Sequence, residues 1–90
     1  MELISTKHFQ KRVKKLIENK KHLKSKIDAC LLDFAEKGKQ SVFYRHRMQG
    51  DKKGLEELQI GGDLRIIIKI LWKADMAYLL DIGTHSQLKI

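Results

Sequence analysis

Histidine and arginine are the side chains of this sequence best suited to chemistry on a phosphate group. A histidine gains and loses a proton near neutral pH, so it can serve as a general base or a general acid. The planar guanidinium of an arginine matches phosphate oxygens and stabilises added negative charge on them. Metal-free cleavage of an RNA phosphodiester needs a base, an acid and such a cation. Residues of these types that could do this work are His46, Arg65 and His85, and no metal or cofactor is expected.

The sequence around each candidate leaves a structural role open beside the chemical one. His85 follows a glycine and a threonine at the end of an expected strand, so it can project from the rim of a sheet or simply lie on the surface. His46 shares a strand face with a tyrosine and a methionine, so it can equally be a half-buried histidine. Asp63 lies in a turn, where aspartate is common for structural reasons. Arg65 falls on the mixed face of a strand, opposite an apolar face.

Two helices are expected before residue 40. Apolar side chains recur there at intervals of three and four residues, as on one face of an amphipathic helix. They are Phe9, Val13, Leu16, Ile17, Leu23, Ile27, Cys30, Leu31 and Phe34. Ser5 or Thr6 can cap the first helix, and residues 18–22 hold the break between the two. Gly38 can end the second helix because glycine accepts a left-handed backbone.

After residue 40 the apolar pattern changes to the alternation that is typical of strands. The expected strands cover residues 42–48, 55–60, 64–72 and 76–82, with a short edge strand at 3–5. One face of 64–72 is wholly apolar, and the two helices can cover it. We therefore expect an α+β domain in which an N-terminal helical hairpin packs on an antiparallel, meander-like sheet of three or four strands. The other face of the sheet is expected to be exposed.

The charge of the chain is the first sign of a partner. The sequence carries 19 Lys and Arg against 11 Asp and Glu, a net charge of +8. Residues 1–54 have a net charge of +9 and residues 55–90 of −1. Basic surface at this density attracts nucleic acid, an anionic membrane or an acidic protein, although lysines also keep small proteins soluble. His8 and His22 lie in the basic half, and we expect them to be solvated.

Length and composition favour one cytoplasmic domain over residues 1–90. A core of this size cannot be divided, and a hydrophobic fraction of 42% suits a compact fold. The apolar stretch 64–72 is interrupted by Arg65 and Lys69 and falls short of the roughly 20 residues of a membrane span. The N-terminus lacks the apolar region of a secretory signal. Cys30 is the single cysteine, which fits a reducing compartment.

Three segments resemble the RelE/ParE toxin superfamily, and its YafQ-like (RelE/StbE) branch in particular. They are HRMQG (46–50), GLEELQIGGDLRIIIKI (54–70) and YLLDIGTHSQL (78–88). The similar order is a glycine before a strand, a GGD-like hairpin turn, an arginine opening the central strand and a G-T-H-S segment after the last strand. RelE- and YafQ-like members are ribosome-dependent mRNA endonucleases held inactive by an antitoxin encoded beside them. ParE-like members use the same scaffold to inhibit DNA gyrase.

The resemblance also implies roles for single residues. His85 matches the G-T-H histidine and His46 the histidine of an H-x-L-x-G stretch. Asp63 matches a catalytic aspartate, and Arg65 the arginine that clamps the scissile phosphate. The expected substrate-binding residues are Arg45, Arg47, Lys69 and Lys89.

Several positions depart from the family pattern. Gln59 stands where YafQ-like toxins have a histidine, and Glu57 and Gln59 stand where RelE-like toxins have lysines. Asp81 replaces an arginine, and Lys89 replaces the C-terminal aromatic that stacks on a base. Such a stacking contact contributes about 1–3 kcal/mol per base. A glutamate at 57 can serve as a general base, but it adds no positive charge for the phosphate.

These features favour the toxin of a type II toxin–antitoxin system, acting as a metal-independent mRNA endonuclease (mRNA interferase) that arrests translation. His85 and His46 are then the acid and the base, assisted by Asp63 or Glu57. Its partners are a cognate antitoxin, in a hetero-oligomer, and mRNA on the ribosome, with no membrane. The departures motivate an alternative, a ParE-like gyrase inhibitor or a degenerate toxin that acts by binding only. A basic nucleic-acid-binding module without chemistry is a third reading.

Overall fold

A five-stranded sheet runs through the computed structural model, which describes residues 1–45 and 54–88. The strands are β1 (Glu2–Ser5), β2 (Tyr44–Arg45), β3 (Glu56–Gly61), β4 (Leu64–Leu71) and β5 (Met76–Thr84). Their order across the sheet is β1-β5-β4-β3-β2. Strands β2 to β5 pair antiparallel, but β1 pairs parallel to β5. The expected antiparallel pairing holds for β2 to β5, and the edge strand expected at 3–5 forms as β1. The expected sheet was not exact, because β1 adds a fifth, parallel strand and the direction in which an edge strand pairs leaves no mark on its side-chain pattern.

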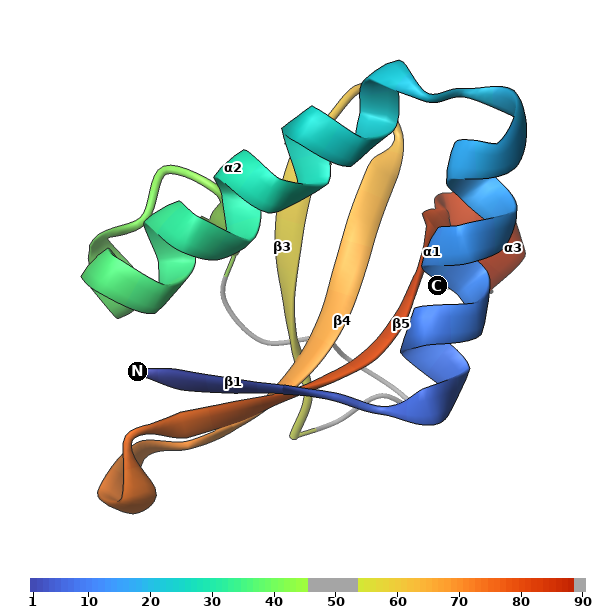
Figure 1. Cartoon of the computed structure of the whole chain (residues 1–90). Coiled ribbons are helices and arrows are strands. Elements are labelled where there is room, and N and C mark those ends of the chain that lie inside the picture. The colour runs from blue at the N-terminus through green and yellow to red at the C-terminus, as the bar shows by residue number, and fades with distance from the viewer. Residues whose placement is uncertain (46–53, 89–90) are drawn as a thin grey trace.

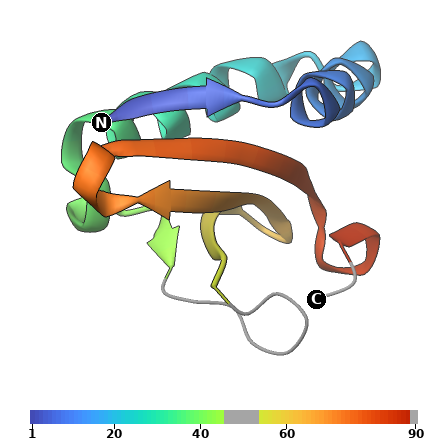
Figure 2. The ribbon, with the colours of Figure 1, turned by 90° about the horizontal axis from the view of Figure 1, so that it is seen from below.

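Two long helices, α1 (Lys7–Asn19) and α2 (His22–Lys37), cover one face of the sheet (Figure 2). Thr6 caps α1, since the Phe9 N–H donates to Thr6 Oγ1 at 3.2 Å. Helix α2 ends at Gly38, whose φ of 56° suits a glycine. The helices diverge from their connection, with α1 along β5 and α2 over β3 (Figure 1). The helices pack on one face of the sheet as expected, but they diverge instead of forming a hairpin, because each packs on a different strand. Within the described residues, no helix is long and apolar enough to cross a membrane.

The main core lies between these helices and the sheet. Its buried side chains are Phe9, Ile27, Cys30, Phe34, Leu58, Ile66, Ile68, Ile70, Ala77, Leu79 and Ile82. Alternate residues of β4 thus face the helices, as the apolar spacing predicted. Phe34 is fully buried, and its ring stacks on that of Tyr44 with 6.2 Å between centroids. This contact ties α2 to β2.

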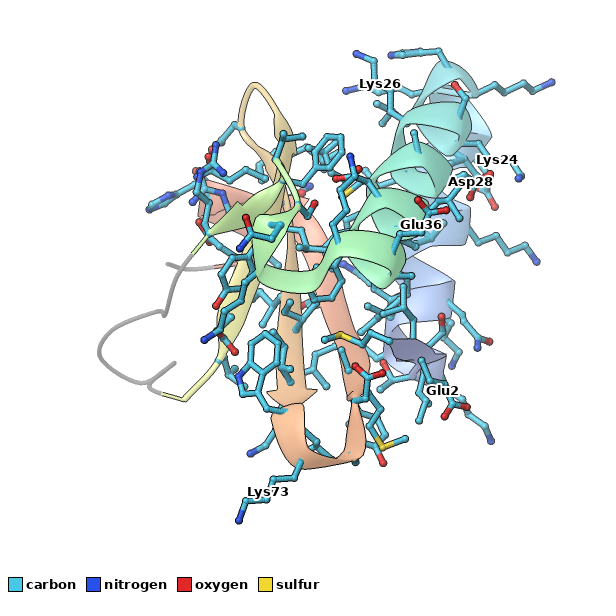
Figure 3. The ribbon with its side chains drawn as sticks, turned by 90° about the vertical axis from the view of Figure 1, so that its left-hand side faces the viewer. Glu2, Lys24, Lys26, Asp28, Glu36 and Lys73 are labelled. Atoms are coloured by element: carbon cyan, nitrogen blue, oxygen red, sulfur yellow. The ribbon has the colours of Figure 1, made fainter. Side chains whose placement is uncertain are left out.

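The outer face of α2 is charged and takes no part in the core. Figure 3 shows Lys24, Lys26, Asp28 and Glu36 pointing away from the sheet. Lys24 Nζ lies 2.8 Å from Asp28 Oδ2, with both side chains more than half exposed. A pair of this kind contributes about 0.3–0.5 kcal/mol. This face therefore offers positions where a charge can be removed with little effect on folding.

The strand expected at 42–48 begins later than its alternation suggested. Val42 is 70% exposed in a turn, and pairing starts at Tyr44. The turn forms because the Ser41 hydroxyl accepts from the Phe43 N–H at 3.2 Å and donates to Asp33 Oδ2 at 2.7 Å. Positions 46–48 of that expected strand lie outside the described residues.

Two short 3-10 turns, η1 (Gly38–Gln40) and η3 (Trp72–Ala74), meet at one end of the molecule. Strand β4 stops at Leu71, so Trp72 leaves the apolar face on which it was expected and is 43% exposed. The Lys39 ammonium lies 4.7 Å from the centroid of the Trp72 ring. A cation over an exposed indole compensates part of the missing burial.

The sheet face away from the long helices is only partly open. After β5 the chain forms a short helix, α3 (His85–Leu88), on the far side of the sheet (Figure 2). Leu88 and Ile67, each 3% exposed, form a second small core there. A register shift between Ile67 and Ile68 leaves Leu80 unpaired with β4 and packed on that core. The expectation of a fully exposed second face was therefore wrong in this region.

Candidate functional site

The centre of the candidate site is a largely buried ion pair between neighbouring strands. Arg65 on β4 lies with Nη1 3.4 Å from both carboxylate oxygens of Glu57 on β3. The two side chains are only 15% and 11% exposed. Both project from the face away from the helices, because Leu58 and Ile66 beside them turn to the core. At this depth screening by salt is weak, so the pair fixes the arginine firmly.

Two further side chains complete the setting of Arg65. Gln59, directly opposite Arg65 in the strand register, donates from Nε2 to Glu57 Oε1 at 3.2 Å. Asp63, in the turn that opens β4, places Oδ1 3.6 Å from Arg65 Nη2. The buried Arg65 Nε has no acceptor among the described residues. This Nε has almost no exposed surface, so a ligand would meet the Nη groups of Arg65 instead.

Asp63 also connects this arginine to His85. The backbone N–H of His85 donates to Asp63 Oδ2 at 3.2 Å. The following turn is closed by reciprocal bonds, from the Thr84 N–H to Gln87 Oε1 at 2.9 Å and from the Gln87 N–H to Thr84 Oγ1 at 3.3 Å. These contacts form a capping box, and they leave the His85 side chain exposed to solvent. The T-x-x-Q spacing of Thr84 and Gln87 is the signal in the sequence for this turn.

The structure therefore joins three of the four candidate residues, Asp63, Arg65 and His85, through contacts at one end of β4 and β5. The fourth, His46, lies outside the described residues, as do Arg47 and Lys89. Arg45 and Lys69 were expected to bind substrate. Arg45 lies opposite Glu57 in the register, but its Nη1 donates to backbone carbonyls of its own strand and turn, at 2.9 and 3.0 Å. Lys69 is exposed further along β4 on the same face as Arg65.

The two histidines expected to be solvated have different surroundings. His22 is exposed at the start of α2. His8 instead lies with Nε2 3.2 Å from Asp81 Oδ1, and Arg12 Nε lies 3.3 Å from the same oxygen. Sequence reasoning missed Arg12. The signal was its type, since it is the only arginine among many lysines before residue 40.

Two other groups that could act as a nucleophile or an acid are held in their neutral forms. Burial, and then the charge of Asp33, raises the pKa of the Cys30 thiol to about 12. Burial, and then a hydrogen bond to Glu56, raises the pKa of the Tyr44 hydroxyl, which donates to Glu56 Oε1. Neither group ionises near neutral pH. Both belong to the packing of the fold rather than to the site.

The arrangement places a fixed guanidinium near a proton-transfer group, with the carboxylates of Glu57 and Asp63 beside the guanidinium. Arg65 supplies a preorganised cation, Asp63 fixes the turn that presents His85, and Glu57 holds the arginine in place. Over residues 1–45 and 54–88, no group of three or more His, Cys, Asp or Glu side chains is placed to hold a metal ion.

Solved structures with the same fold include bacterial toxins. A copper-bound mutant toxin from Helicobacter pylori is 27% identical, with 98% of each chain covered and a TM-score of 0.80. YafQ from E. coli is 20% identical, with 97% of this chain and 96% of that chain covered and a TM-score of 0.74. YafQ in the E. coli DinJ–YafQ complex is 21% identical over the same shares, with a TM-score of 0.72. No protein-family model matches the sequence, and no curated protein is similar enough to count as a relative.

Proposed function

We propose that this chain, which belongs by fold to the RelE/YafQ-like toxin superfamily, is the toxin of a type II toxin–antitoxin system and cuts mRNA on the ribosome. The observation that carries this proposal is the buried Arg65, held by Glu57 and Asp63 next to the turn that presents His85. A fixed cation beside an exposed histidine is what phosphodiester cleavage needs. The net charge of +8 supports a polyanionic substrate.

In the proposed reaction, one of His85 and His46 takes the proton of a ribose 2′-OH, and the 2′-oxygen attacks the adjacent phosphorus. The P–O5′ bond breaks, and the other histidine gives a proton to the leaving 5′-oxygen. Arg65 stabilises the extra negative charge on the phosphorane. The products are a 2′,3′-cyclic phosphate and a 5′-hydroxyl. Asp63 assists by holding the His85 turn. The residues proposed to bind the substrate strand are Arg45, Arg47, Lys69 and Lys89.

Expression of the chain alone tests the proposal. We expect growth arrest and mRNA fragments with 5′-hydroxyl ends at discrete codons, mapped by primer extension on ribosome-bound messages. His85→Ala should abolish both effects. Ser86→Ala is the matched control, because it changes the exposed neighbour on the same turn. Undiminished cleavage by the His85 variant would show that the proton transfers are assigned to the wrong group.

A second candidate function, a toxin that acts by binding only, is favoured by one specific observation. Asp81 stands where YafQ-like members have an arginine, and its carboxylate is occupied by His8 and Arg12. A supercoiling assay with purified gyrase separates the candidates. Inhibition of gyrase without RNA cleavage would establish the binding function in place of the nuclease.

The proposal includes a cognate antitoxin as a partner in a hetero-oligomer, and the DinJ–YafQ complex among the similar structures supports it. An acidic segment of such a partner would neutralise the basic surface electrostatically. Co-expression of a small acidic open reading frame from the same locus should restore growth. The two chains should also co-purify, and the complex should weaken as salt rises.

A further inference from the structure

The end of β5 is packed closely around Gly83. A Cβ at this position would lie 2.8 Å from Gln87 Oε1 and 3.1 Å from Arg12 Nη2. Gly83 is also the register partner of Arg65 on β4. The missing side chain therefore makes room for groups from α1 and α3 at the end of β5 that carries the candidate site.

The Arg12 side chain lies beside Gly83 because two acceptors bind its guanidinium. Its Nε lies 3.3 Å from Asp81 Oδ1 and 3.4 Å from the carbonyl oxygen of Ile82. The side chain is 34% exposed. Both of these contacts with described residues use Nε, so the two Nη groups keep donors for a ligand.

The guanidinium borders a hollow of about 400 Å³ between α1 and α3. Its lining residues are Arg12, Lys15, Leu16, Asn19, Ile82 and Gln87. None of these described lining residues is acidic. A neighbouring hollow of about 380 Å³ shares Leu16 and Gln87 and extends to Asp63 and Thr84. The two hollows thus lie next to each other, between Arg12 and the turn that presents His85.

We propose that the hollow beside Arg12 binds a backbone phosphate of the RNA strand next to the one that is cut, with Arg12 as its main ligand. Asp81 and Gly83 are positioning residues, since Asp81 holds the guanidinium and Gly83 leaves space for it. The nature of the substrate rests on the proposed function. The site itself rests on the geometry of Arg12, and binding can be measured without cleavage.

The lining favours RNA over an acidic protein segment. An amphipathic helix that docks in a groove needs a row of apolar anchors. This hollow presents instead guanidinium, ammonium and amide donors, with only Leu16 and Ile82 as apolar walls. Such donors match phosphate oxygens and the polar edges of bases.

Fluorescence anisotropy with a short, labelled 2′-O-methyl RNA that cannot be cut tests the proposal. Arg12→Gln should weaken binding about tenfold and lower the slope of log K against log salt by about one. Arg12→Lys should recover part of the affinity, because it keeps the charge but loses the planar fork. Lys26→Gln removes the same charge from the outer face of α2 and should change affinity less than about twofold.

Asp81→Asn separates positioning from net charge. Removing a carboxylate should strengthen RNA binding if charge alone decides, whereas loss of the Arg12 contact should weaken it about threefold. Gly83→Ala should weaken binding similarly, and it should also lower the melting temperature, because its Cβ would meet Gln87 Cβ at 3.2 Å as well as the capping oxygen Gln87 Oε1 at 2.8 Å. Equal RNA affinity for Arg12→Gln and Lys26→Gln, or tighter binding by Asp81→Asn, would overturn the proposal.

A second probe, a Glu-rich peptide, tests whether the site prefers RNA to other polyanions. If Arg12→Gln weakens binding of a Glu-rich peptide as much as binding of RNA, the hollow is a general polyanion site and the RNA assignment fails. If Arg12-dependent RNA binding persists in a protein that cuts no RNA, the site stands and the proposed endonuclease function fails. The two failures are thus distinguishable.

Discussion

Replacing Glu57 by Gln should change stability and RNA binding in opposite directions. Glu57 and Arg65 are 11% and 15% exposed, with both carboxylate oxygens 3.4 Å from Arg65 Nη1. Removal of one partner from a buried ion pair costs about 3–5 kcal/mol, because the other charge loses its compensation. Here Asp63 Oδ1 stays 3.6 Å from Arg65 Nη2, and a Gln at 57 still offers an accepting oxygen. We therefore expect a loss of about 2 kcal/mol, below that range.

A loss of this size is easy to measure in a chain of 90 residues. About 1 kcal/mol corresponds to about 4–8 °C in such a domain, so the melting temperature should fall by roughly 8–16 °C. A double-mutant cycle with Arg65→Gln separates the pair from its surroundings. Glu36→Gln, an exposed carboxylate on the outer face of α2, is the matched control and should leave the melting temperature within about 2 °C.

RNA binding should strengthen in the same variant. The Glu57 carboxylate repels a phosphate that approaches Arg65, and a unit charge a few ångström away contributes about 1 kcal/mol in a water-like dielectric. This corresponds to an affinity about fivefold higher for an uncleavable RNA. If the melting temperature does not change, or if RNA affinity falls, the reasoning about this ion pair is wrong. If cleavage falls while binding tightens, Glu57 takes part in proton transfer.

Three further predictions concern the packing and the charges of the fold. Leu88→Ala should lower the free energy of unfolding by about 2 kcal/mol, the low end for a buried leucine in a small core. It should also lower RNA cleavage further than unfolding explains, because Leu88 fixes α3 and with it His85, and melting curves measured beside cleavage rates check this. The Cys30 thiol, with its pKa raised to about 12 and no exposed surface, should react with a thiol reagent in urea but only slowly in the folded protein, and rapid native labelling would contradict its burial. The Ser41 hydroxyl and then the Lys37 ammonium hold the pKa of Asp33 below its ordinary value, so its stabilisation is complete above about pH 4 and is lost as pH falls through the lowered pKa. When urea unfolding is measured from neutral to strongly acidic pH, the midpoint concentration of urea should therefore fall less steeply for Asp33→Asn than for the unchanged chain.

Most of the elements could be predicted from local patterns. The spacing of apolar residues predicted both helices, and alternation predicted β4 and β5, because burial on one face of an element repeats with its own period. Thr6 and Gly38 as helix ends follow from capping chemistry that needs no tertiary contact. The order of elements is therefore largely a local property of this chain.

The arrangement of those elements could not be predicted in the same way. The parallel pairing of β1 with β5 uses backbone groups alone, so no side chain signals it. The divergence of α1 and α2 depends on which strands each helix covers. The short helix α3 was missed although Thr84 and Gln87 have the spacing of a capping box, because four residues carry too little periodicity to stand out.

For the candidate site too, some features could be predicted from the sequence and others could not. The sequence by itself determined the residue types, and His85, Asp63 and Arg65 could be named because they match positions of the family that the sequence resembles and because histidine and arginine suit proton transfer and phosphate binding. Only the tertiary structure decided that Glu57 holds Arg65, that Asp63 connects it to the His85 turn, and that Asp81 brings Arg12 from α1 to Gly83. Each of these contacts joins elements distant in sequence, and ion pairs form wherever packing brings opposite charges together. The sequence determines the chemistry of each side chain, whereas packing sets the distances between side chains on which a function depends.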